Sequence, residues 1–153
     1  MRVSAKTDYA LRAAVELAAA HGDGMPVKGE RLATSQAIPL RFLENILLQL
    51  RHAGIVESRR GADGGYKLAR APEEITLADV IRAIDGPLAG VSGARPETLD
   101  FQGRAEPLRE VWIAVRASLR GVLEHVTLAD VAAGELPENV RALVAEPDAW
   151  VAH

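Results

Sequence analysis

The amino-acid sequence predicts a mainly α-helical fold that contains one small β-hairpin. Apolar residues recur at the helical spacings of three and four along most of the 153 residues. Only residues 55–70 show two short alternating runs, separated by a turn that contains three glycines. No apolar run approaches the roughly 20 residues needed to cross a bilayer, so we expect a cytoplasmic protein with no membrane partner.

Two helices are expected in the first quarter of the chain. The first runs from about Ala5 to His21, because Ser4 can cap it and Asp8 places negative charge in its first turn. A shorter helix from about Lys28 to Thr34 follows, and residues 35–37 form a turn. The short helix contains a glycine, so tertiary packing must hold it.

The third helix has two distinct faces. It begins at Pro39, which suits a first helical position, and ends before Gly54, which suits a left-handed cap. Its apolar stripe comprises Leu43, Ile46, Leu47 and Leu50, and its opposite face comprises Arg41, Asn45, Leu48, Gln49 and His52. The outer face therefore offers amide and cationic side chains.

A hairpin of residues 55–60 and 66–70 follows this helix directly, and its four cations are Arg59, Arg60, Lys67 and Arg70. A polar helix joined to an Arg-rich hairpin is typical of the recognition helix and wing of a winged helix-turn-helix. Asn and Gln can pair with adenine and Arg with guanine in the major groove, and an Arg of the wing can enter a minor groove. The alternative is a solvated helix face and a surface hairpin in another small α+β domain.

The charge distribution agrees with a DNA-binding first half. Residues 1–70 hold 11 Lys and Arg against 7 Asp and Glu, a net charge of +4. Residues 71–153 hold 7 Lys and Arg against 14 Asp and Glu, a net charge of −7. The net charge of −3 for the whole chain is therefore the sum of a basic half and an acidic half. A DNA-binding half fused to an acidic assembly or sensing half would show this asymmetry.

The second half begins with a capped helix and a long loop. In residues 75–80 a Thr at the cap and an acidic residue three positions later predict a helix from Leu77 to about Asp85. Residues 88–106 show no apolar period, and loops of this length are usually functional or disordered.

A long helix that opens at Pro107 is the expected dimerisation element. Its apolar residues follow the spacings of a coiled-coil seam, namely Leu108, Trp112, Val115, Leu119, Val122 and Val126. The seam is too short for an independent coiled coil, so we expect it to contact both its own domain and a partner copy. The alternative is the core helix of a monomer.

The chain then divides into three parts. A winged helix-turn-helix domain occupies residues 1–72, and a linker helix, loop and dimerisation helix occupy residues 73–133. Residues 134–153 form a C-terminal short helix, starting near Pro137, and a tail. A second Thr-Leu-Ala-Asp-Val string at Thr127 repeats the capping chemistry of the first.

Several kinds of chemistry find no support in the sequence. The chain has no cysteine, which excludes disulfides, thiolate metal sites and thiol redox sensing within it. Its four histidines lack metal-ligand spacing, the glycine-rich residues 61–67 lack the phosphate-loop pattern, and no hydrolase motif is present. We therefore expect no enzyme, no metal and no other cofactor.

These residues resemble the Rrf2 family of bacterial transcriptional regulators. The similarity lies in the start MRVSAKTDYALRAAVELA, the block from Ile38 to Ile81, and the later LREVW and VTLADV. It covers the chain from Met1 to about Val131, and the SxRGxxGGYxLA wing, Ser58 to Ala69, is its most specific part. The resemblance implies a homodimeric winged-helix protein that binds double-stranded DNA and represses transcription at an imperfect palindrome.

The resemblance also assigns DNA contacts to three places in the chain. Those on the third helix are Pro39, Arg41, Phe42, Asn45 and Gln49, and those on the wing are Arg59, Arg60, Gly61, Gly64 and Gly65. Arg2, Ser4 and Lys6, near the first helix, would contact phosphates.

The sequence departs from the family at the loop before the long helix. Well-known members hold an iron-sulfur cluster there with cysteines, and the corresponding residues 90–112 contain none. Relatives place the cofactor between this loop, the start of the long helix and the first helix of the neighbouring protomer. The equivalent volume would be lined by Asp8, Ser92, Arg95, Glu106, Arg109 and Trp112, a candidate pocket for a small organic effector. The alternative is that side chains fill this volume, and a regulatory protein is another candidate partner.

The sequence thus predicts a sequence-specific DNA-binding transcriptional regulator. We expect a homodimeric repressor of a palindromic operator, controlled by something other than an iron-sulfur cluster. The alternative is a winged-helix protein-interaction module that has lost DNA binding.

Overall fold

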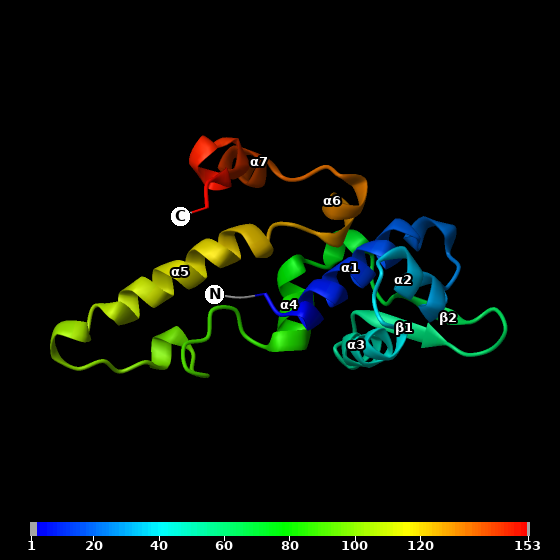
Figure 1. The fold of residues 1–153 in the computed structure, drawn as a ribbon, viewed down its shortest axis with the longest axis horizontal. Helices are drawn as coiled ribbons and strands as arrows, with labels where there is room; N and C mark the ends of the chain where they lie inside the picture. Colours follow the sequence, from blue (N-terminus) through cyan, green and yellow to red (C-terminus); the bar gives the residue numbers. More distant parts are fainter. Residues whose placement is uncertain (1–2, 153) are drawn as a thin grey trace.

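The computed structural model describes residues 3–152, which form helices around one β-hairpin (Figure 1). The α-helices are α1 (Ala5–Ala19), α2 (Gly29–Ser35), α3 (Leu40–His52), α4 (Leu77–Asp85), α5 (Leu108–Leu123), α6 (Leu128–Ala133) and α7 (Glu138–Ala145). The strands are β1 (Val56–Arg59) and β2 (Gly65–Leu68). The 3-10 turns are η1 (His21–Asp23), η2 (Pro72–Glu74), η3 (Pro96–Thr98), η4 (Gly103–Ala105) and η5 (Pro147–Trp150). Within this part of the chain, no helix combines the length and apolar character that a membrane crossing requires.

Helix α1 lies at the centre of the hydrophobic core, where it packs against α3, α4, α6 and β2. Its buried face is made mostly of alanine, and Ala10, Ala13 and Ala14 are completely inaccessible to solvent. Short side chains let the neighbouring helices approach closely, so this surface is well packed without large residues. The four leucine and isoleucine residues of the predicted α3 stripe are also fully buried, which confirms the helix and its inward face.

The first three helices differ from expectation by one or two residues at their ends. Ser4 caps α1 as predicted, because the Thr7 N–H donates to Ser4 Oγ at 3.1 Å. The helix ends at Ala19 instead of His21, and η1 follows it. Pro39 is the capping residue of α3, so the helix begins one position later than the sequence pattern indicated.

The hairpin follows α3 and is tied to the helical lobe. Strands β1 and β2 pair antiparallel, with Val56 opposite Leu68 and Arg59 opposite Gly65. Val27 extends this ladder, since its N–H donates to the Tyr66 carbonyl and its carbonyl accepts from the Tyr66 N–H, both at 2.8 Å. The hairpin is thus anchored at its return strand, while the turn between its strands extends away from the body (Figure 1).

The two Thr-Leu-Ala-Asp-Val strings lie side by side in space. Thr76 and Thr127 form an antiparallel bridge, with Leu77 N–H donating to the Val126 carbonyl and Leu128 N–H donating to the Ile75 carbonyl. Each Thr caps its own helix in a full capping box. Ile75, Val80 and Leu128 join the core around α1, so this core crosses the domain boundary that we expected at residue 72.

Helix α5 lies outside this core. None of its described residues is fully buried, and it contacts mainly η3 and α4. The preceding loop runs out along α5 and turns back at its far end (Figure 1). This long loop is ordered by a Val91–Ala94 bridge and by η3 and η4. Helix α7 is held to α5 by Asn139 Nδ2, which donates to the Gly121 carbonyl at 2.9 Å.

Candidate DNA-binding surface

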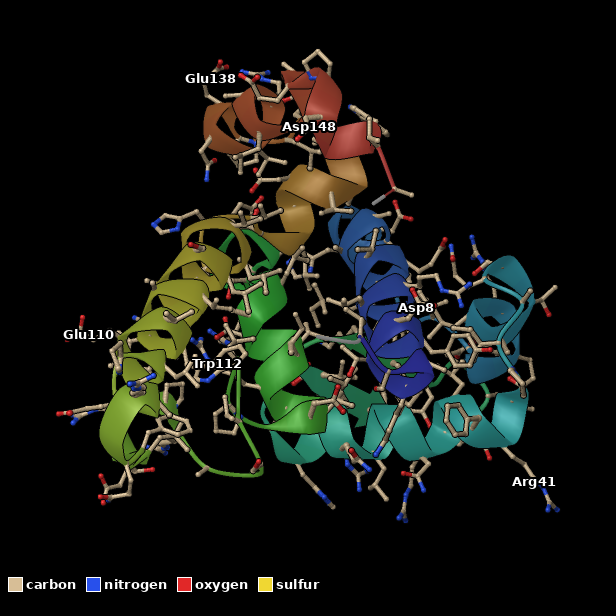
Figure 2. The ribbon with its side chains drawn as sticks, turned by 60° about the vertical axis from the view of Figure 1, so that its left-hand side comes forward. Asp8, Arg41, Glu110, Trp112, Glu138 and Asp148 are labelled. Atoms are coloured by element: carbon tan, nitrogen blue, oxygen red, sulfur yellow. The ribbon has the colours of Figure 1, made fainter. Side chains whose placement is uncertain are left out.

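The outer face of α3 presents hydrogen-bonding side chains to solvent. Arg41 and Asn45 are exposed, and Gln49 is half-buried beside them. Gln49 Nε2 donates to Asn45 Oδ1 at 3.1 Å, so the two amides are aligned one helical turn apart. Figure 2 shows Arg41 extending from the end of α3 away from the body of the molecule. The face can therefore present amide and guanidinium groups to the edges of base pairs.

Residues from α1 and α3 converge on one shallow hollow at the start of α3. Lys6 lies there with four predicted contacts from the helix, Pro39, Arg41, Phe42 and Asn45. Tyr9 of α1 holds the two helices together here, because its ring meets the Phe42 ring edge-on at a centroid distance of 5.7 Å. Five of the predicted DNA-contacting residues are thus brought together by the fold.

The wing offers two unpaired arginines. Lys67 is bound to Glu57 at 2.7 Å across the strands, and Arg70 Nη1 donates to the Glu74 carbonyl at 3.2 Å. Arg59 and Arg60 are exposed, and neither makes a side-chain hydrogen bond or ion pair within residues 3–152. The hairpin therefore leaves two guanidinium groups available for phosphate or a minor groove.

Two glycines of the wing are required by close backbone contacts. A Cβ at Gly64 would lie 2.2 Å from the Arg59 carbonyl oxygen, and a Cβ at Gly65 would lie 2.5 Å from the Val27 carbonyl oxygen. Gly61 has open space around it and a φ of +107°. All three were predicted as DNA contacts, and the structure gives Gly64 and Gly65 a reason within the protomer itself.

Ser4 lies in a different environment from Lys6. Its hydroxyl donates to the Asp85 carboxylate at 3.2 Å and caps α1, so it is occupied within the protomer and lies beside a negative charge. This position does not favour a phosphate contact. Arg2, the third residue predicted near the first helix, lies outside the described residues.

The predicted dimerisation seam is partly accessible. Leu108 is 42% exposed, and Trp112, Val115, Leu119 and Val122 are half-buried. Val111, which the heptad pattern missed, is 49% exposed and adds apolar surface at the start of α5. Its exposure could not be found from spacing alone, since the seven-residue period assigns it to a flank.

Val126 is a correction to the seam. Helix α5 ends at Leu123, and Val126 lies in the connection to α6 with only 3% of its surface exposed. Its carbonyl accepts the Leu77 N–H at 3.0 Å. Val126 belongs to the core of the protomer and cannot contribute side-chain surface to a contact with a partner copy.

The predicted effector-pocket residues do not meet within one protomer. Asp8 is paired with Arg12 at 2.8 Å on α1, whereas Trp112 lies on α5 at a separate place, with α4 between these helices (Figure 2). Among the main hollows of the described residues, one is lined by Arg95, and none is lined by any of the other five predicted residues. Ser92, Glu106 and Arg109 lie along the loop and the start of α5. Arg95 faces other arginines there, a grouping that residue spacing did not predict.

The donor set does not fit an iron-sulfur cluster. Such clusters are held mainly by cysteine thiolates, and the sequence has no cysteine. The described residues also contain no group of three or more His, Asp or Glu placed to hold a metal ion.

The sequence matches a known family and curated proteins over most of its length. The profile of the Rrf2 family, described as iron-dependent transcriptional regulator, matches residues 3–134. A Mycobacterium tuberculosis (strain H37Rv) chain named as an HTH-type transcriptional regulator is 52% identical over 143 residues, covering 94% of this chain and 88% of that one. The HTH-type transcriptional regulator CymR of Bacillus subtilis is 39% identical over 132 residues, covering 86% of this chain and 90% of that one.

Solved structures agree with this match. CymR of B. subtilis, described as its global cysteine regulator, superposes with a TM-score of 0.75 at 36% identity, covering 88% of this chain and 98% of that one. IscR of T. potens superposes with a TM-score of 0.68 at 33% identity, covering 100% of this chain and 93% of that one. The winged-helix fold predicted from the helix and hairpin is confirmed by these neighbours. The chain belongs to the Rrf2 family of DNA-binding transcriptional regulators, and it is not an enzyme.

Proposed function

We propose that this regulator is a homodimeric repressor that reads a palindromic operator with α3 and the wing. The observation that carries the proposal is the convergence of Lys6, Arg41 and Asn45 at the start of α3. The wing adjoins the same end of the helix, because the exposed Arg59 lines a second hollow with Leu40 and Glu44 of α3. Asn45 and Arg41 offer bidentate hydrogen bonds to adenine and guanine, and Lys6 offers a point charge for a phosphate. Base reading and backbone positioning are therefore available on the same surface.

The wing contributes in a different way. Arg59 and Arg60 extend from a short two-stranded hairpin that has no fixed partner for their charges within the described residues. Arginine is attracted to the enhanced negative potential of a narrow minor groove. We assign these two residues to sequence-tolerant contacts beside the major-groove site, where they add affinity and a preference for A/T-rich flanks.

A second copy is needed to complete the reading unit. One α3 covers only a half-site, and a two-fold dimer addresses two half-sites about one helical turn apart. Helix α5 supports this arrangement because a 16-residue helix with no buried residue leaves its apolar seam without full cover in one protomer. Leu108 and Val111 are the exposed large apolar residues of that helix.

The controlling signal is proposed to be something other than an iron-sulfur cluster. The absence of cysteine removes every thiolate that such a cluster needs from this chain. Trp112 and Arg109 remain candidates for a pocket that a partner copy would complete, together with Asp8 of that copy. Whether an effector binds this pocket does not affect the proposal that α3 and the wing bind DNA.

The competing function is a protein-interaction module that kept the winged-helix shape. An interaction module has no need for unpaired arginines beside an amide-bearing helix, and it would show no steep salt dependence. Binding to duplex DNA at several salt concentrations therefore separates the two functions.

The experiment measures binding of purified protein to a duplex selected from random sequence, by fluorescence anisotropy. Arg41→Ala or Asn45→Ala should weaken the selected site by about 1–3 kcal/mol and relax preference at single base pairs. Arg60→Ala should instead reduce affinity across many sequences and lower the salt slope by about 1. Arg104→Ala, an exposed arginine in η4, serves as the matched control.

If no sequence is enriched from the random pool, the result favours a protein-interaction module over a DNA-binding regulator. The assignment of α3 as the reading element is wrong if a sequence is enriched and both α3 variants bind it with unchanged preference.

A further inference from the structure

Four arginines line one hollow between α4, the loop after it and α5. They are Arg82 of α4, Arg95 of the loop, and Arg116 and Arg120 of α5, and the hollow encloses about 210 Å³. The acidic Glu97 also lines this hollow, as does Leu88, which is buried in the loop. Segments that are separate in the sequence, α4, the loop and α5, thus come together in space (Figure 1), and their side chains form the hollow.

The acidic residues of this cluster neutralise only half of the cationic charge. Glu124 is shared, because Arg82 forms an ion pair with it and Arg120 Nε contacts both of its oxygens at 3.0 Å. Arg116 forms an ion pair with Glu97. Arg95 forms no direct ion pair within the described chain and attracts Glu97 only at longer range. Four positive charges therefore face two negative ones.

This excess of positive charge favours an anion in the hollow. Guanidinium groups held close together without matching anions repel one another, and a bound anion relieves that repulsion. Arg116 is only 23% exposed and therefore less screened by water than a free surface arginine. The five N–H donors of a guanidinium group form a fork that matches the oxygens of phosphate or carboxylate.

We propose that this hollow binds a small dianion, a phosphate group or a short dicarboxylate, as the effector of the protein. The two negative charges match the excess of two positive charges in the cluster. Arg95 would close over the ligand from the loop, while Arg82, Arg116 and Arg120 contact it from the helices. The site differs from the pocket that the family resemblance indicated, with which it shares Arg95 alone.

The position of the hollow allows a bound ligand to affect the helices that bind DNA. Helix α4 packs directly against α1 and α3, whereas α5 carries the exposed seam. A dianion held by arginines from both helices favours arrangements in which α4 and α5 are close, and so it can bias the spacing of two reading heads. This regulatory role rests on the proposed function, whereas binding of the anion does not.

The first test measures binding without DNA. Inorganic phosphate and succinate are titrated separately into the full-length protein by calorimetry, against sodium chloride at matched ionic strength. We expect saturable binding that Arg95→Gln weakens by about tenfold, the loss of one charge-assisted contact. Arg104→Gln lies in the same loop, outside the hollow, and should bind like the unmodified chain.

Which probe binds identifies the chemistry, since phosphate alone indicates a phosphorylated effector and succinate alone a dicarboxylate. Absence of saturable binding by either probe overturns the proposal. So does binding that Arg95→Gln leaves unchanged, because the anion then lies elsewhere, for example at the DNA-reading surface. Arg95 is exposed and forms no direct ion pair within the described residues, so its substitution should leave the fold intact, which a thermal melt verifies.

The second test adds the selected duplex. The bound dianion should change DNA affinity at least threefold in the unmodified protein and not in Arg95→Gln, both at constant ionic strength. If DNA binds and the anion binds but neither affects the other, the effector role is wrong while the proposed function stands. If no duplex binds at all, the proposed function fails, and the calorimetric result still decides the site.

Discussion

The carboxylate of Asp85 accepts a hydrogen bond from the hydroxyl of Thr7 at 2.5 Å. Thr7 is 1% exposed and is the buried polar residue of the described core, and Asp85 ends α4. Ser4 Oγ donates to the same carboxylate at 3.2 Å. Hydrogen bonds to one acidic side chain therefore hold the start of α1 against the end of α4.

The first prediction concerns the hydrogen bond from Thr7 to Asp85. Asp85→Ala leaves the Thr7 hydroxyl buried without its acceptor, so the free energy of unfolding should fall by about 1–3 kcal/mol. Asp85→Asn keeps an acceptor oxygen and should cost less. Urea denaturation followed by circular dichroism measures both, with Asp63→Ala in the wing turn as the control. Equal stability of all three variants would show that the hydrogen bond contributes nothing.

The second prediction concerns the wing turn. Gly64→Ala places a methyl group 2.2 Å from the Arg59 carbonyl oxygen, so the turn must rearrange at a cost of about 1–3 kcal/mol. Because the rearrangement moves Arg59 and Arg60, DNA affinity should fall while the helical core persists. Gly22→Ala, with open space around it, is the matched control. The close approach would be disproved by unchanged amide NMR shifts along residues 59–68.

The third prediction concerns assembly through α5. Leu108→Asp adds a charge at a position already 42% exposed, so the protomer should fold normally while a contact with a partner copy is weakened. Light scattering should show a smaller mass at micromolar concentration. Ala117→Asp, exposed on the opposite face of the same helix, should leave the mass unchanged. A dimer that tolerates Leu108→Asp must be formed by another surface.

The fourth prediction concerns pH. A hydrogen bond from Arg82, followed by one from Arg120, holds the pKa of Glu124 below its ordinary value of 4.5. A lowered pKa in the folded state means that the ion pairs stabilise the fold above pH 4.5 and that this contribution is lost as the pH falls below it. Glu124→Gln should flatten the decline in stability between neutral and acid pH, compared with the control Glu110→Gln. Denaturation curves at several pH values measure this, and parallel declines in both variants would contradict it.

The fifth prediction concerns iron. Anaerobic incubation with iron and sulfide should give no stable chromophore at stoichiometric iron, because the chain supplies no thiolate. DNA affinity should likewise not respond to nitric oxide or peroxide. Visible absorption and a gel shift with the selected duplex measure both. A stoichiometric cluster, or a tenfold change in affinity, which is about 1.4 kcal/mol, would show that the protein still senses through iron.

The sequence by itself determined the local elements that carry function. The 3.6-residue period placed Leu43, Ile46, Leu47 and Leu50 inward on α3, which left Arg41 and Asn45 outside. The capping boxes at Thr76 and Thr127 defined the starts of two helices. These features depend on residues close together in the chain, so periodicity and capping chemistry suffice to predict them.

Only the tertiary structure decided how distant residues meet. Val126 lies in the core because the two capping strings pair with each other, a contact across about fifty positions that no spacing rule encodes. Ser4, which is half-buried, likewise donates a hydrogen bond to Asp85, a residue 81 positions further along the chain. The four arginines around the hollow belong to three segments, and their excess charge emerges only where α4, the loop and α5 pack together. Long-range packing depends on the whole core, which local sequence patterns do not specify.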